Sequence, residues 1–157
     1  MKYSEAKLGR VFVLRLEDGE IIHQIVEKFA QKKNIKSASV ILLGGADKDS
    51  RIVVGPKQGR VLPIEPMEYI LKDAYETAGV GTIFPNDKGE PVLHMHCVFG
   101  RGEDVKAGCI RRGVKTWYVV EAIIFEIVGS KAIRKLDSKT GFELLEPRVN
   151  SRKTELI

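Results

Sequence analysis

The sequence has no run of about 20 apolar residues that could span a bilayer, and its start, Met1–Glu5, lacks the apolar segment of a secretory signal peptide. These absences favour a cytoplasmic chain without membrane contact. Two cysteines in 157 residues are too few for a disulfide framework, which also fits a reducing compartment. No Ser-, Pro- or Gly-rich linker and no internal repeat divides the sequence. We therefore expect a single domain over residues 1–157, with a core at about 7–147 and a loose basic tail at 148–157.

Asparagine and glutamine are also scarce, with three of each beside a charged content of 30%. This combination occurs in proteins from hot environments, so a thermophilic origin is one expectation. Aromatic residues make up 7%, too few for an evident platform on which nucleic-acid bases could stack. The 26 basic and 21 acidic residues give a net charge of +5. This charge permits a polyanionic partner without requiring one.

Apolar, β-branched runs bounded by turn residues predict a fold made mostly of strands. We expect strands at Arg10–Leu16, Ser37–Leu43, Arg51–Val54, Val61–Ile64, Gly81–Phe84, Val92–Phe99, Thr116–Val128 and Lys131–Leu136. The segment Met67–Thr77 fits a strand or a helix, and we favour a strand. Ile22, Ile25, Val26 and Phe29 recur at helical spacing, with Asp18 near enough to cap that helix. Gly44-Gly45 is expected to end a strand in a tight turn. Short connections favour the α+β class, with a mixed, mainly antiparallel sheet and one or two flanking helices.

The triplet His94-Met95-His96 lies in one of these expected strands. Side chains alternate along a strand, so both imidazoles share a face, roughly 6.5 Å apart along the backbone, where one metal ion can bind both. Cys97 then faces the other side and is a poor ligand, whereas Cys109 follows a turn-rich loop that can bring it back. We call His94, His96 and Cys109 the His–Cys cluster. Two imidazoles and a thiolate favour Zn²⁺ over Mg²⁺ or Ca²⁺ and leave one tetrahedral position open.

Each of these residues also has an ordinary structural interpretation. A His-x-His pair can be two surface or hydrogen-bonded histidines, and Cys109 can be a small buried hydrophobe. We expect His23 to flank the apolar stripe of the helix. Glu121 lies in an otherwise apolar strand, where an unpaired carboxylate is costly. It either faces solvent or acts near the metal, as a partner of a ligand or as a general base.

Short segments spread over residues 7–147 resemble, in order and spacing, the PPC (plants and prokaryotes conserved) domain family, also called the PD1-like DNA-binding motif family. These segments are Ser37–Val40, Leu43–Ala46, Leu93–His96, Ala107–Cys109, Glu121, Arg134, Asp137 and Thr140–Leu145. The resemblance implies a mixed, mainly antiparallel sheet with flanking helices, assembled as a homotrimer. It assigns the family's His-x-His to His94 and His96, and gives Cys109 the position where many members carry histidine. Plant members add an AT-hook with an Arg-Gly-Arg-Pro core, which this sequence does not contain.

We therefore expect a cytoplasmic, homotrimeric, metal-binding domain with zinc at the His–Cys cluster. One alternative is a zinc-dependent hydrolase in which Glu121 is the general base and Arg111 or Lys115 attracts a small anionic substrate. The other alternative is a DNA-associated protein that binds phosphates non-specifically, because +5 per chain becomes +15 in a trimer.

Overall fold

The protein is described by a computed structural model that covers residues 1–148. This part contains one helix and ten strands: β1 (Lys7–Glu17), α1 (Ile22–Lys32), β2 (Ala38–Ala46), β3 (Arg51–Pro56), β4 (Pro66–Ile70), β5 (Tyr75–Pro85), β6 (Pro91–Arg101), β7 (Asp104–Cys109), β8 (Thr116–Val128), β9 (Ile133–Leu136) and β10 (Glu143–Glu146). The expected basic tail lies, apart from its first residue, outside the described residues. No helix within residues 1–148 is long and apolar enough to cross a membrane.

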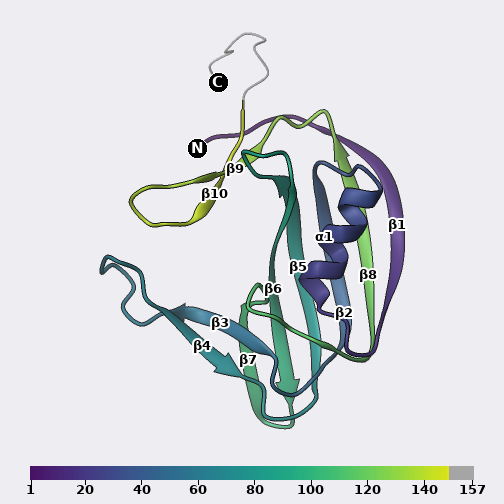
Figure 1. The fold of residues 1–157 in the computed structure, drawn as a ribbon, viewed down its shortest axis with the longest axis vertical. Helices are drawn as coiled ribbons and strands as arrows, with labels where there is room; N and C mark the ends of the chain where they lie inside the picture. The colour runs from purple at the N-terminus through teal and green to yellow at the C-terminus, as the bar shows by residue number, and fades with distance from the viewer. Residues whose placement is uncertain (149–157) are drawn as a thin grey trace.

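Eight strands form one sheet in the order β1-β8-β2-β5-β6-β7-β3-β4, and β9 and β10 form a separate hairpin (Figure 1). Every strand pairing in the described part is antiparallel. The fold is therefore predominantly β with a single helix. The antiparallel pairing and the helix agree with the predicted α+β fold, a mixed, mainly antiparallel sheet with one or two helices, but the described strands include no parallel pair. Consecutive strands joined by short turns pair directly, which produces antiparallel neighbours.

The helix α1 packs on one face of the sheet and buries Ile22, Val26 and Ala30 against it (Figure 1). These side chains belong to one core cluster with alternate residues of the central strands, among them Val40 and Met95. The residues between them on each strand point to the opposite face. We call that opposite side the helix-free face.

The sequence predicted most strands, but the following expectations were wrong. Residues 61–64 form no strand, and the partner of β3 is β4 instead. The segment Met67–Thr77 is divided between the end of β4 and the start of β5, with a turn between them. Gly44 and Gly45 do not end β2, which continues to Ala46. The strand passes through a bulge here, where Gly44 has a φ of +144° and pairing with β8 shifts register.

The helix begins without the expected cap. The residue before it, Ile21, makes no side-chain capping hydrogen bond. Asp18 instead accepts a hydrogen bond from the backbone N–H of Tyr118, at 2.8 Å. This bond links the β1–α1 turn to the start of β8, where Tyr118 has a left-handed φ of 57°.

We expect the variant Gly45→Ala to lose about 1–3 kcal/mol of the free energy of unfolding, measured by urea denaturation. A Cβ atom at Gly45 would lie 2.5 Å from the carbonyl oxygen of Trp117 and 2.7 Å from its ring, so the bulge has to shift. Gly59→Ala is the matched control, because a Cβ there meets nothing within 4 Å and the backbone φ is not left-handed. Equal stabilities of the two variants would contradict this account of β2.

Candidate metal centre

Strand pairing alone brings the His–Cys cluster together. His96 on β6 is the register partner of Cys109 on β7, and the two strands are joined by a turn at Gly102 with a φ of 56°. Cross-strand partners point to the same face with Cβ atoms about 5 Å apart. His94 lies two residues earlier on β6, on the same helix-free face. The three side chains therefore meet on one face of two adjacent strands.

The distances in the cluster suit one tetrahedral ion. The Nε2 atoms of His94 and His96 lie 3.1 Å apart. With Zn–N bonds of about 2.0–2.1 Å, two tetrahedral imidazole ligands are separated by about 3.3 Å. All three potential ligand atoms lie within 4.8 Å of one another. A Zn–S bond of about 2.3 Å requires about 3.6 Å between sulfur and nitrogen, so a movement of about 1 Å completes the set.

The surroundings of His94 keep its imidazole neutral, which is the form that binds a metal. The pKa of His94 is lowered to about 4, chiefly by burial and in smaller part by the positive charges of Arg134 and Arg111 and by His96. At neutral pH the ring is therefore already unprotonated, and it can bind a cation without first releasing a proton.

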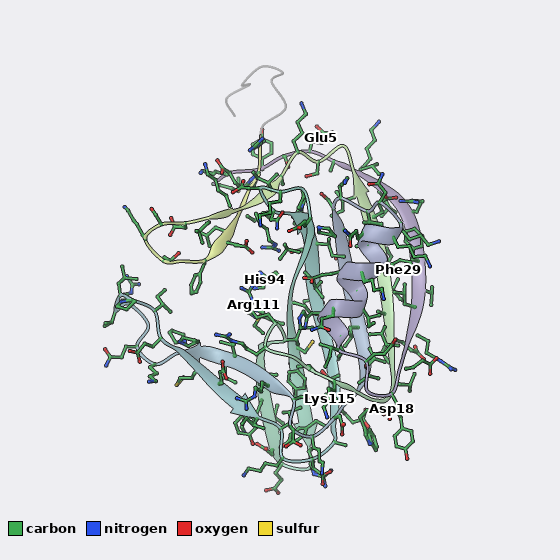
Figure 2. The ribbon with its side chains drawn as sticks, viewed as in Figure 1. Glu5, Asp18, Phe29, His94, Arg111 and Lys115 are labelled. Atoms are coloured by element: carbon green, nitrogen blue, oxygen red, sulfur yellow. The ribbon has the colours of Figure 1, made fainter. Side chains whose placement is uncertain are left out.

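Two arginines flank the cluster from different elements. The Nε–H of Arg111, in the β7–β8 loop, donates a hydrogen bond to the Cys109 sulfur at 3.2 Å. The Nη2 of Arg134, on β9, donates to the Thr82 hydroxyl at 2.9 Å. Thr82 is the register partner of His94, so this guanidinium lies beside the first imidazole. Figure 2 shows His94 and Arg111 together beside β6, between the β9–β10 hairpin and the β3–β4 hairpin.

The remaining candidates lie elsewhere. Cys97 is buried on the core side of β6, where burial raises the pKa of its thiol to about 12, as its alternation with the histidines predicted. His23 is half-buried in the first turn of α1, and burial lowers its pKa. Glu121 is exposed on β8, with β2 and β5 between it and β6. Three strand spacings separate it from β6 by roughly 14 Å, so within one chain it does not reach the cluster.

The basic segment 111–115 divides between two environments. Arg112 pairs with Glu68 at 3.0 Å, and Lys115 pairs with Asp47 at 3.1 Å. Only Arg111 of this segment turns toward the cluster. The sequence showed that the segment is basic, but it did not show which of its side chains form ion pairs and which one turns toward the cluster. It also carried no local signal that Arg134, 40 residues after His94, lies beside that histidine.

Comparison with known proteins agrees with the fold. The sequence model of the Plants and Prokaryotes Conserved (PCC) domain matches residues 3–128. A metal-containing protein from Archaeoglobus fulgidus is 23% identical, with a TM-score of 0.79 over 92% of this chain and 98% of its own. A plant- and prokaryote-conserved protein from Pyrococcus horikoshii is 27% identical, with a TM-score of 0.79 over 93% and 97%.

A more distant structure, from Bacteroides thetaiotaomicron, is named for a proposed DNA-binding role. It is 15% identical, with a TM-score of 0.71 over 90% of this chain and 96% of its own, and at this identity it shows the fold alone. No curated protein matches the sequence significantly.

We expect the imidazole of His94 in the metal-free protein to titrate with a pKa of about 4, measured by NMR. Because this folded-state pKa lies below the unfolded value of about 6.5, protonation favours unfolding. The neutral imidazole of His94 makes its full contribution to the free energy of unfolding above about pH 6.5. This contribution is lost as the pH falls through about 4. Urea denaturation of the metal-free protein at several pH values should show this loss of stability in the parent protein and a smaller loss in His94→Gln. A titration midpoint near 6.5 would contradict this description of the site.

Proposed function

The chain belongs to the Plants and Prokaryotes Conserved (PCC) domain family, and within that family we propose that it is a homotrimeric protein that binds zinc at the His–Cys cluster. The observation that carries the metal proposal is the β6–β7 register, which gathers two imidazoles and a thiol with their ligand atoms within 4.8 Å. Bound there, a zinc ion would supply Lewis-acid chemistry at a coordination position that these three residues leave free.

The donor set supports zinc in particular. Nitrogen and sulfur ligands select zinc or another transition metal over magnesium and calcium, which prefer oxygen. A neutral His94 and a sulfur atom within reach provide such ligands without an acidic side chain. The metal-containing relative from Archaeoglobus fulgidus shares the fold, which agrees with the proposal.

The helix-free face supports self-association. Five apolar side chains of β1, β2, β5 and β6 are exposed on it: Val13, Ile41, Leu43, Val80 and Val98. Val80, with 67% of its surface exposed, lies at the centre of this group. A cavity of about 710 Å³ crosses the same face and is lined by four of the five. Contiguous exposed apolar surface is typical of protein interfaces. The uncovered face of an antiparallel sheet is usually polar, so these exposed apolar side chains favour a cover on this face. A second and a third copy of the chain would provide that cover, as the family resemblance implies.

The two alternative functions receive less support. Zinc-dependent hydrolysis through Glu121 would need that carboxylate near the cluster, and within one chain β2 and β5 lie between them. Non-specific DNA binding would need free basic groups on one surface, whereas Arg112 and Lys115 of the basic segment form ion pairs. Metal binding by an oligomer is therefore the function that the geometry supports best.

We expect protein purified without added zinc to contain about one zinc ion per chain by elemental analysis. The double variant His94→Ala/His96→Ala and the single variant Cys109→Ala should hold almost none, because each removes ligands that the remaining residues cannot replace. His23→Ala and Cys97→Ala are matched controls, since they remove the third histidine and the second cysteine, and should retain the parent zinc content. A parent protein with almost no zinc, unchanged in the double variant, would refute the proposal.

We expect the parent protein to elute with about three times its chain mass of 17.5 kDa when light scattering follows size-exclusion chromatography. Val80→Asp should shift the mass to that of the single chain, because a carboxylate buried in an interface loses its hydration. Val61→Asp is the control, as Val61 is also exposed but lies in the loop before β4. A single-chain mass for the parent protein would show that the helix-free face stays uncovered.

A further inference from the structure

Arg134 is a buried cation without an acidic partner among residues 1–148. Its side chain is 4% exposed, and its Nε atom is buried with no hydrogen-bond acceptor among the described residues. The polar contacts of its guanidinium are the hydroxyl and, at 3.4 Å, the carbonyl oxygen of Thr82. A buried charge is costly unless an opposite charge compensates it. Something in the working protein is therefore expected to supply negative charge at this position.

Arg111 adds a second uncompensated cation beside the same histidines. Within residues 1–148 neither Arg111 nor Arg134 has a carboxylate within ion-pair distance. Glu143, on the strand paired with β9, acts on Arg134 only from a greater distance. By contrast, the neighbouring Arg112 and Arg51 share Glu68, at 3.0 and 3.6 Å. The fold thus pairs the neighbouring Arg112 and Arg51 with a carboxylate, but it gives Arg111 and Arg134 no such partner among the described residues.

The two guanidinium groups reach the cluster from opposite ends. Arg134 is fixed through Thr82 beside His94, and Arg111 is fixed through the sulfur of Cys109. Figure 2 shows that the side chains of His94 and Arg111 share the space between the two projecting hairpins. A guanidinium presents planar N–H donors in a fork that matches the oxygen atoms of phosphate and carboxylate groups.

We propose that Arg134 and Arg111 form, together with the metal position of the His–Cys cluster, a binding site for a small oxyanion. The ligand class is a small molecule with a phosphate or carboxylate group, whose oxygens accept hydrogen bonds from the guanidinium donors. This inference rests on the proposed zinc site. It adds the chemistry of the ligand, and it explains why a buried arginine has an unused donor.

Isothermal titration calorimetry of the zinc-loaded protein tests the inference, in a buffer free of phosphate and carboxylate. Inorganic phosphate and acetate serve as separate probes, which distinguish the two ligand groups. We expect saturable binding of at least one probe. Arg111→Gln and Arg134→Gln should each weaken it roughly tenfold or more, because each removes charge-assisted hydrogen bonds. Arg112→Gln is the matched control and should bind within about twofold of the parent protein, since its guanidinium is paired with Glu68.

Two further measurements distinguish a failure of the metal proposal from a failure of the oxyanion inference. Zinc content is determined for every variant, so a protein without zinc contradicts the metal proposal, and the oxyanion inference falls with it. Zinc-loaded protein that binds neither probe, or binds it equally well in Arg111→Gln, overturns the oxyanion inference and leaves the metal proposal intact. Arg111 is exposed, so its replacement tests the site even if Arg134→Gln does not fold. The visible spectrum of the cobalt-loaded protein gives an independent readout, which the bound probe should change in the parent protein and less in Arg111→Gln.

Discussion

The alternation of side chains along β6 is the constraint on which the rest of the structure depends. Met95, Cys97 and Phe99 point into the core beneath α1, and the histidines between and before them point to the helix-free face. Hydrogen bonds to β5 and β7 fix both sets at once. The imidazoles consequently have the rigidity of a buried central strand, although they lie at the surface. Ligands held on a packed strand keep their mutual spacing better than ligands on a loop.

The electrostatics of the cluster follow from this rigid placement. Among the described residues, the metal-ligand candidates grouped with the two imidazoles include no carboxylate, and two guanidinium groups lie nearby instead. Positive surroundings and partial burial both favour the neutral form of His94, which a cation can bind. The same surroundings repel a lone cation, so a bound metal and a bound anion would stabilise each other. Metal binding and oxyanion binding at this site are therefore expected to be coupled.

The sequence predicted those parts of the fold that depend on the pattern of apolar and turn residues within a short segment. Thr116–Val128 was predicted to the residue as β8, and the strands expected at Gly81–Phe84 and Val92–Phe99 lie within β5 and β6, because β-branched runs between turn residues have a short-range signal. Gly44-Gly45 misled the prediction, since glycine favours turns but here admits a close approach by the backbone of β8. His94 and His96 could be paired from their spacing alone. Their neighbour Arg134 could not, because the β9–β10 hairpin reaches Thr82 through a tertiary contact that no local pattern encodes.

Placing ligands and core on one strand also makes the centre vulnerable to a particular error. Had β6 paired one residue out of step, every side chain on it would change sides of the sheet. The sulfur of Cys97 and the thioether of Met95 would then face outward, and both imidazoles would enter an apolar interior without partners. The correct strand register of β6 therefore buries its core side chains and places the two histidines on the helix-free face at the same time. An insertion of one residue within β6 would abolish both together, whereas a longer loop between β5 and β6 would leave both unharmed.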